Sequence, residues 1–593
     1  MRENVMTKQE KLTAFLPMTV EEMKARKWDA IDILLISGDA YADHPMSGPA
    51  VIGRVLLDAG YRVGYCAQPD WKDPESLKRF GRPLLGCAVT SGNMDSMVKL
   101  YTAGRRLRHE DMFAPGGKPG LCPPHATVVY SQLARQAFPG IPVIAGGVEA
   151  SLRRVAHYDY WQDKMRPSIL VDSKADLLCY GMGERSVLKI FERLKEGKSL
   201  EGLRGTCRYL GGKESKSFPV DESCVVLPSY EEICSDRLAI MELTKLVERE
   251  MNPWNGKRLL QWTNGRLLVI EPPEYPMTTE EYDRVCDLPF TGLQHWSYQE
   301  LIPAWDIVKC SIPAIRGCPG GCAFCGIMVH HGHHLISRSI ESILRSVEQL
   351  KRQPFFKGII TDLGGAAGNI FQHGPRDPER CKKCKRISCL FPEFCPNYHA
   401  DEKPLLELLE RITGMEGVKK VLLNSGQRLD LALVQKKLTE KVIRDHTPGH
   451  LGVAPEHLDP EVLRLMRKGK PGEMEKFREI FDRVNRQTGK KQFMDPYFIS
   501  NFPGCTRKQM KVVDDFLVRN HWDPRQVQDY IPLPMTMGCA MYCAGVDPEG
   551  NPIEVNRGLA ERREQRNMLR RKHTAPGNDK KAIKQHKIKH NKR

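Results

Sequence analysis

The sequence has no apolar run that approaches the roughly 18 residues needed to span a bilayer. Its first ten residues also lack the apolar core of a secretory signal peptide. Hydrophobic residues make up 41% of the chain and charged residues 27%, which is typical of a soluble globular protein. We therefore expect a cytoplasmic protein that has no membrane partner.

At 593 residues the chain is too long for one hydrophobic core, so two or three domains are expected. It contains 19 cysteines, and structural disulfides are rare in the cytoplasm. The cysteine content therefore indicates metal or redox chemistry.

The net charge of +17 is concentrated near the end of the chain. Residues 561–593 hold 13 Lys and Arg against 3 acids and few apolar residues, which predicts a basic disordered tail. Such a tail binds nucleic-acid phosphates by releasing counterions. The alternative is a solvated solubility tail, because no aromatic residues are interleaved with the basic ones.

Cys318, Cys322 and Cys325 form a Cys-x3-Cys-x2-Cys motif among several glycines. An iron–sulfur cubane needs four ligands, so a loop with three cysteines leaves one iron open. Glycines let the backbone fold closely around a bulky cluster. The alternative is a zinc site completed by one of the histidines that follow, namely His330, His331, His333 and His334.

The triplet resembles the signature of radical S-adenosylmethionine (SAM) proteins, which place an aromatic residue before the third cysteine, as Phe324 is placed here. The resemblance implies a [4Fe–4S] cluster held by the three cysteines, with SAM on the open iron. Reduction then cleaves SAM into methionine and a 5′-deoxyadenosyl radical. The resemblance further implies that Phe324 packs near the adenine, and that an electron donor such as flavodoxin or ferredoxin is a partner.

The triplet lies at the start of a series of alternating strands and helices. Strands are expected at residues 309–316, 358–363, 419–424, 451–454, 492–499 and 526–532. Six such strands suggest a partial (β/α)6 barrel, the fold usual for radical SAM proteins. Active sites of parallel barrels lie at the carboxyl ends of the strands, and the cysteine loop follows the first strand.

Polar residues and glycines follow the next strands. Gly364 and Gly365 resemble the superfamily Gly-Gly-Glu motif that contacts the SAM amino group, although the acid is absent, and Asp362 or backbone carbonyls would take its place. Ser425 and Arg428 follow the third strand, where polar groups commonly touch the SAM ribose and carboxylate. The alternative for each residue is a structural role on the barrel rim.

The front of the chain also alternates strands and helices, with a helix expected at residues 48–60. Strands are expected at residues 31–37, 61–67, 83–90, 141–145 and 176–180. This pattern predicts an α/β domain with a doubly wound parallel sheet, whose ligands lie at the carboxyl ends of the strands.

Loops after these strands resemble those of cobalamin-binding domains, which have an Asp-x-His-x-x-Gly motif, a serine and a Gly-Gly pair. The corresponding residues here are Asp43, His44, Ser91, Gly146 and Gly147. The resemblance implies that His44 is the lower cobalt ligand, but no residue separates it from Asp43 as the family pattern requires. The alternative is the same fold without the cofactor.

A second cysteine group, Cys381, Cys384, Cys389 and Cys395, lies in an insertion at residues 376–400. Four thiolates within a short segment fit a closed zinc site or an auxiliary iron–sulfur cluster. The alternative is a loop of unliganded cysteines, which would be prone to oxidation.

Nearly the whole chain resembles the YgiQ-type radical SAM protein family, a resemblance that supplies no substrate. The segments that carry it are residues 15–18, 38–45, 68–71, 147–161, 180–185, the cysteine triplet and 527–532. We expect a cobalamin-binding-like α/β domain at residues 1–200, a connector that extends the N-terminal region at 201–303 with helices within 229–250, a radical SAM core at 304–558 and the tail at 559–593.

The leading hypothesis is a radical SAM enzyme of unknown substrate. The main alternative is a nucleic-acid-binding or redox-sensing protein with structural iron–sulfur or zinc sites, motivated by the basic tail and by Lys382, Lys383, Lys385 and Arg386. An enzyme that modifies RNA would combine the two.

Overall fold

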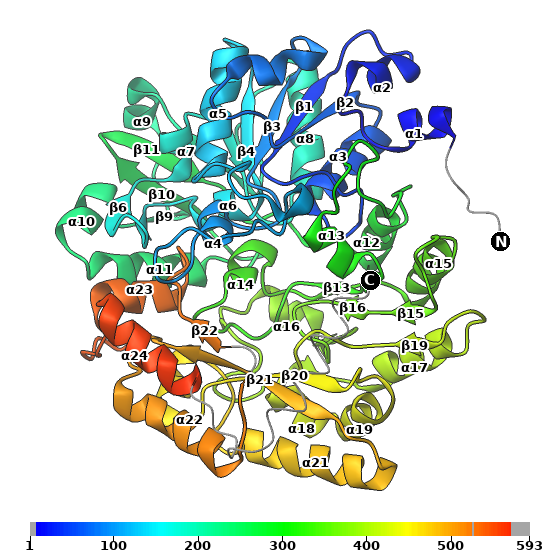
Figure 1. Cartoon of the computed structure of the whole chain (residues 1–593). Helices are drawn as coiled ribbons and strands as arrows, with labels where there is room; N and C mark the ends of the chain where they lie inside the picture. Colours follow the sequence, from blue (N-terminus) through cyan, green and yellow to red (C-terminus); the bar gives the residue numbers. More distant parts are fainter. Residues whose placement is uncertain (1–6, 525–526, 571–593) are drawn as a thin grey trace.

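A computed structural model describes residues 7–524 and 527–570. Its front half is built on a large sheet, and its second half on shorter strands that lie beneath that sheet in Figure 1. No helix among the described residues is long and apolar enough to cross a membrane.

The front sheet has nine strands in the order β2-β1-β3-β4-β7-β8-β11-β10-β9. Its first five strands are mutually parallel, as the sequence predicts. They are β2 Val63–Ala67, β1 Ile33–Ser37, β3 Gly86–Thr90, β4 Val143–Gly146 and β7 Leu177–Cys179. All five residues of β1 are buried, because helices cover both faces of the sheet.

Alternate residues of β1 enter different hydrophobic clusters. Leu34 and Ile36 pack with α5 Ala126–Ala137 on one face. Ile33 and Leu35 pack on the other face, with α3 Gly48–Asp58 and α8 Glu184–Lys195. This two-sided burial explains why the first four residues of the strand are all apolar, with only Ser37 at its end polar.

Residues 201–303, expected as a connector that extends the N-terminal region, add strands to the front sheet. They contribute β8 Thr206–Tyr209, β9 Cys224–Val226, β10 Arg258–Thr263 and β11 Arg266–Ile270. Strands β7, β8, β11 and β10 pair antiparallel in turn, so the whole sheet is mixed and not purely parallel. Helices are present within residues 229–250, as expected. They are α10 Tyr230–Ser235 and α11 Ala239–Arg249, and between them Asp236 accepts a hydrogen bond from the Leu238 amide and turns the chain.

The second half contains short strands at all six expected positions, in sequential and parallel order. Strand β12 Ser311–Pro313 pairs with β16 Asp362–Gly364, and β15 Ile359–Ile360 pairs with β19 Lys420–Val421. A bridge between Gln427 and Val453 leads to β20 His450–Glu456, β21 Phe493–Ser500 and β22 Val527–Asp529.

The last described segment is helix α24 Leu559–Arg570. Its Arg562 is buried and bonds Asp529 at 2.9 Å, so disorder is wrongly predicted for residues 559–570. The basic stretch 571–593 lies outside the described residues.

Candidate functional site

The cysteine triplet lies in the loop between β13 Ile315–Arg316 and α14 Gly326–His331. The amide of Cys318 donates to the Gly332 carbonyl at 3.3 Å, which closes the loop at its far end. Gly317 has a φ of +84°, and a β-carbon there would lie 2.1 Å from the His334 carbonyl oxygen. The loop therefore requires glycine to reach this compact form.

The three thiols meet the chemical requirement for an iron–sulfur cluster. Burial raises the pKa of the Cys325 thiol to about 12, and the neighbouring thiols of Cys322 and Cys318 contribute to the shift. The pKa of Cys318 is also raised, chiefly by burial. The free thiols of Cys318 and Cys325 would stay protonated, and as thiolates they need the positive charge of bound iron. The donor set and the glycine cradle fit a cluster.

Arg428 lies beside this loop. Its Nη1 is 3.4 Å from the Cys322 sulfur, and its other guanidinium nitrogens bond Asp430 at 3.1 and 2.5 Å. A β-carbon on Gly320 would lie 2.5 Å from Arg428 Nη1, so the missing side chain at this position leaves room for the guanidinium where it lies. The structure thus brings Arg428 to the cysteines, and its contact with the SAM ribose or carboxylate stays a prediction.

Ser425 is bound to Asp362. Its hydroxyl donates to Asp362 Oδ2 at 2.5 Å, and the amides of Asn424 and Ser425 donate to Oδ1 at 2.9 and 3.1 Å. The carboxylate joins the ends of the second and third strands of this half. Both residues lie at the strand ends, as expected, and their polar groups already bond each other.

Gly364 and Gly365 line a cavity of about 480 Å³ between the two halves of the molecule. The front wall comes from the carboxyl ends of the parallel strands, at Thr90, Gly92 and Gly146. A β-carbon on Gly365 would lie 2.3 Å from Ile315 Cγ1, so glycine keeps this wall thin. The cavity was not predicted from the sequence. Ligands of parallel sheets bind at the carboxyl ends of the strands, and that rule indicates a binding surface on each half but not that the two surfaces face each other.

Phe324 and His44 lie away from that cavity wall. The Phe324 ring is half-buried and meets Phe502 edge-on, with ring centroids 6.4 Å apart. His44 is buried, and its Nδ1 accepts a hydrogen bond from the Met46 amide at 3.2 Å. Burial lowers the pKa of His44 to about 4, although the Asp43 carboxylate opposes this. Pro45 and Met46 line the cavity but His44 does not, so the structure does not support His44 as a cobalt ligand.

Glu456 is a site residue that the sequence analysis did not single out. It lies at the end of β20 with a φ of +65° and forms an ion pair with Lys468 at 3.6 Å. Burial raises the pKa of its carboxyl, which Lys468 opposes. A strained, half-buried acid whose charge acts on the Cys325 thiol is typical of a functional site.

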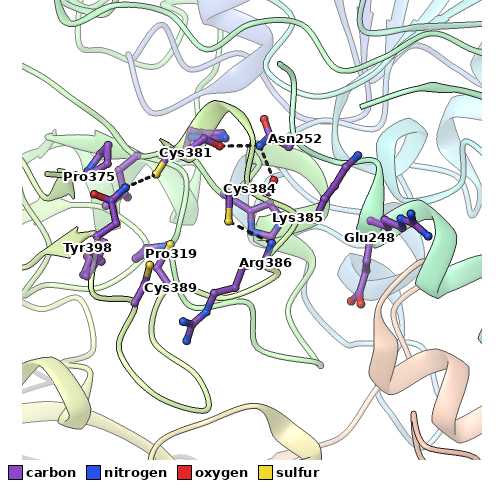
Figure 2. Close-up of a pocket in the computed structure, with 17 residues that line it drawn as sticks. Glu248, Asn252, Pro319, Pro375, Cys381, Cys384, Lys385, Arg386, Cys389 and Tyr398 are labelled. Atoms are coloured by element: carbon purple, nitrogen blue, oxygen red, sulfur yellow. Dashed lines mark hydrogen bonds between the residues drawn. The ribbon is translucent and has the colours of Figure 1, made fainter. Parts of the chain in front are cut away.

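The second cysteine group forms part of the wall of another cavity, of about 110 Å³ (Figure 2). Its wall includes all four cysteines of the insertion, Cys381, Cys384, Cys389 and Cys395. His333 and His334 line the same cavity, whereas His330 Nδ1 lies 2.9 Å from the Ser151 hydroxyl. Among the described residues, no three Cys, His, Asp or Glu side chains are arranged to hold a single metal ion.

Comparisons with known proteins agree with the radical SAM resemblance. The family model described as Radical SAM N-terminal matches residues 15–311, a segment that ends before the cysteine triplet. A UPF0313 protein of Bradyrhizobium diazoefficiens is 41% identical over 94% of this chain and 87% of its own length. One from Methanosarcina acetivorans is 41% identical over 94% of this chain and 78% of its own length.

Solved structures give more distant matches. A radical SAM methyltransferase, TsrM of Kitasatospora setae, with cobalamin and a [4Fe–4S] cluster bound, matches with a TM-score of 0.49 and 15% identity, over 87% of this chain and 76% of that one. The cobalamin-dependent SAM radical enzyme OxsB with aqua-cobalamin bound matches with a TM-score of 0.46 and 11% identity, over 87% and 56%.

Proposed function

The chain belongs to the UPF0313 family and contains its Radical SAM N-terminal region, and from this premise we propose that it is a radical SAM enzyme. The observation that supports the proposal best is the loop of Cys318, Cys322 and Cys325. Its three thiols follow β13, which comes directly after the parallel strand β12, and they lie within a glycine-rich backbone. In this proposal the second half is a partial (β/α)6 barrel and the front sheet is a cobalamin-binding-like domain.

The three cysteines would hold a [4Fe–4S] cluster, and when bound that cluster supplies the electron that splits SAM into methionine and a 5′-deoxyadenosyl radical. The electron would come from a flavodoxin or ferredoxin. Arg428, held by Asp430, places positive charge beside the Cys322 sulfur. Phe324 would pack against the adenine, and the Asp362–Ser425 pair would fix the rim on which SAM lies.

The large cavity between the halves would admit the molecule on which the radical acts. It extends from the strand ends of the front sheet to Gly326 and Ile327, directly after Cys325. We propose that cobalamin also binds in this cavity, since its glycine-lined front wall leaves room for a large planar group. Its cobalt would have no ligand from His44.

The decisive test is an assay of 5′-deoxyadenosine by mass spectrometry, after anaerobic loading with iron and sulfide, reduction and addition of SAM. Wild type should form the product, and Cys325→Ala should form none. Cys234→Ala, at an exposed cysteine on α10, is the matched control and should behave as wild type. A fully loaded wild type that forms no product, with or without added cell metabolites, would contradict the proposal.

Nucleic-acid binding by the tail remains a prediction, because residues 571–593 lie outside the described part of the chain. Two basic residues of the insertion already form ion pairs within the protein. Lys385 bonds Glu250 at 2.8 Å and Lys382 bonds Glu379 at 2.6 Å. If RNA is the substrate, deletion of residues 571–593 should weaken RNA binding and reduce its dependence on salt.

A further inference from the structure

The four cysteines of the insertion are held in place from two sides. Asn252, from the front half of the chain, donates from its side-chain amide to the carbonyls of Cys381 and Cys384 at 2.9 and 2.8 Å. Asn255 does the same to Lys382 and Cys384 at 2.8 and 3.2 Å. The cysteine loop is therefore a defined structure, fixed by contacts from more than 120 residues away.

Two of the sulfur atoms accept hydrogen bonds. Asn397 Nδ2 lies 3.2 Å from the Cys381 sulfur, and the Arg386 amide lies 3.3 Å from the Cys384 sulfur. Figure 2 shows the contact between Arg386 and the Cys384 sulfur. Donors of this kind stabilise metal-bound thiolates and tune the potentials of iron–sulfur clusters.

The arrangement of the four cysteines favours a cluster over a single ion. Zinc binds four thiolates at about 2.3 Å, so its ligands must converge closely. Among the described residues, no three Cys, His, Asp or Glu side chains are arranged to hold one metal ion. The four cysteines instead lie along the wall of a cavity of about 110 Å³, which His333, His334 and Tyr398 also line. Four thiolates around a wider centre are the donor set of a [4Fe–4S] cluster with no open iron.

The insertion is also bonded directly to the first cysteine loop. The amide of Cys389 donates to the Pro319 carbonyl at 2.8 Å, one residue from Cys318. The Ser388 hydroxyl donates to the Gly320 carbonyl at 2.6 Å. Gly321, beside Cys322, is so close that a β-carbon would lie 2.6 Å from the Ile387 carbonyl oxygen. The backbones that would hold the two clusters are therefore in direct contact.

We propose that Cys381, Cys384, Cys389 and Cys395 ligate a second [4Fe–4S] cluster, through which an electron from a donor protein reaches the cluster of the first loop. The ligation is independent of the chemistry at the first loop, and the electron path depends on the radical SAM function proposed above. One electron enters from the reduced donor, passes from the second cluster to the first, and ends in the C–S bond of SAM that breaks.

The ligation is tested on the full chain by counting iron and sulfide and by Mössbauer spectroscopy after anaerobic loading. Wild type should hold about eight irons, and the variant Cys318→Ala/Cys322→Ala/Cys325→Ala should keep about four. The variant Cys384→Ser should lose the second set alone, while Cys234→Ser should keep all of it. A triple variant that holds no iron, or one zinc per chain, would overturn the proposal.

The electron path is tested by comparing SAM cleavage with two different reductants. Cys384→Ser should cleave SAM when the small reductant dithionite is supplied, and should lose cleavage when reduced flavodoxin is the only donor. Equal cleavage by wild type and variant with flavodoxin would overturn the path. If the radical SAM function itself were wrong, neither protein would cleave SAM with dithionite, yet the iron count of the triple variant would still test the second site.

Discussion

The guanidinium of Arg316, two residues before Cys318, forms an ion pair with the carboxylate of Glu184, at the start of α8 in the front half. Arg316 also lies over the Tyr282 ring, 4.9 Å from its centroid. Both charged residues line the large cavity. The pair therefore connects the cysteine loop to the sheet that forms the opposite wall.

We expect Glu184→Gln to lower the free energy of unfolding by about 3 kcal/mol, because it leaves the Arg316 charge largely buried without its partner. Chemical denaturation of the purified protein measures the change. Glu75→Gln removes one partner of the exposed Lys78 pair and should change stability by less than about 1 kcal/mol.

The pair also predicts a dependence on pH. Burial opposes ionisation of Glu184, but Arg316 outweighs it, so the pKa of Glu184 is lowered. The stabilisation is complete above the unfolded pKa of about 4.3 and is lost as pH falls through the lower folded pKa. A wild type that loses no more stability than Glu184→Gln over this acidic range would contradict the assignment.

Gly321→Ala should destabilise the contact between the two cysteine loops. Gly321 has a φ of +62°, and a β-carbon there would lie 2.6 Å from the Ile387 carbonyl oxygen. We expect a loss of about 1–3 kcal/mol and lower iron content, measured by denaturation and metal analysis. Gly212→Ala is the matched control, because that glycine has no positive φ and no atom within 4 Å of the added carbon. Equal effects of the two substitutions would contradict this account.

The strands of both halves could be predicted from the sequence because a run of buried residues identifies a strand without reference to its partner. The run at β1 is an example, with all five residues buried. Strands β8 to β11 were missed. They form one end of a mixed sheet and are interrupted by short helices, so their sequence lacks the regular strand–helix alternation of the first five strands. The direction of a strand depends on its partners, and local sequence does not encode it.

The candidate site also has features that local sequence predicts and features that depend on residues far apart in the chain. The spacing of Cys318, Cys322 and Cys325 predicts a cluster loop because all three ligands are close in sequence. The position of Arg428 beside the Cys322 sulfur depends on a pairing with Asp430 and on a contact 106 residues away along the chain. The partners of Asn252 in the second cysteine loop are similarly distant, so no local pattern could have indicated them.

Arg428→Gln should make the first cluster harder to reduce. The substitution removes a positive charge next to the Cys322 sulfur and leaves the negative Asp430 there. Reduction adds negative charge, so we expect a more negative midpoint potential, measured by redox titration with electron paramagnetic resonance. Arg464→Gln, at a partly exposed arginine paired with Glu461, should leave the potential unchanged. A potential that does not move in Arg428→Gln would show that this charge does not act on the cluster.

The cavity between the halves predicts how cobalamin binding responds to substitution. Ile327 lines the cavity and is 38% exposed, so Ile327→Trp should fill part of it without disturbing the core. We expect less cobalt per chain after loading with hydroxocobalamin, at unchanged iron content. His44→Ala should keep the wild-type cobalt content, because His44 does not line the cavity. Loss of cobalt in His44→Ala alone would contradict this placement, and a wild type that binds none would remove cobalamin from the proposal.

Glu473 predicts a loss of stability as pH rises towards neutrality. Burial raises the pKa of its carboxyl to about 7, and the Asp430 carboxylate adds to the shift. The folded protein therefore binds this proton more tightly than the unfolded chain, whose pKa is about 4.3, and stability falls between these two values as pH rises. Glu473 is half-buried, so after allowance for solvent screening we expect an effect on the order of 1 kcal/mol.

Glu473→Gln should be more stable than wild type at pH 8 and no more stable at pH 4, as measured by chemical denaturation at each pH. A variant that is less stable than wild type at pH 8 would mean that Glu473 is ionised and held by Lys468.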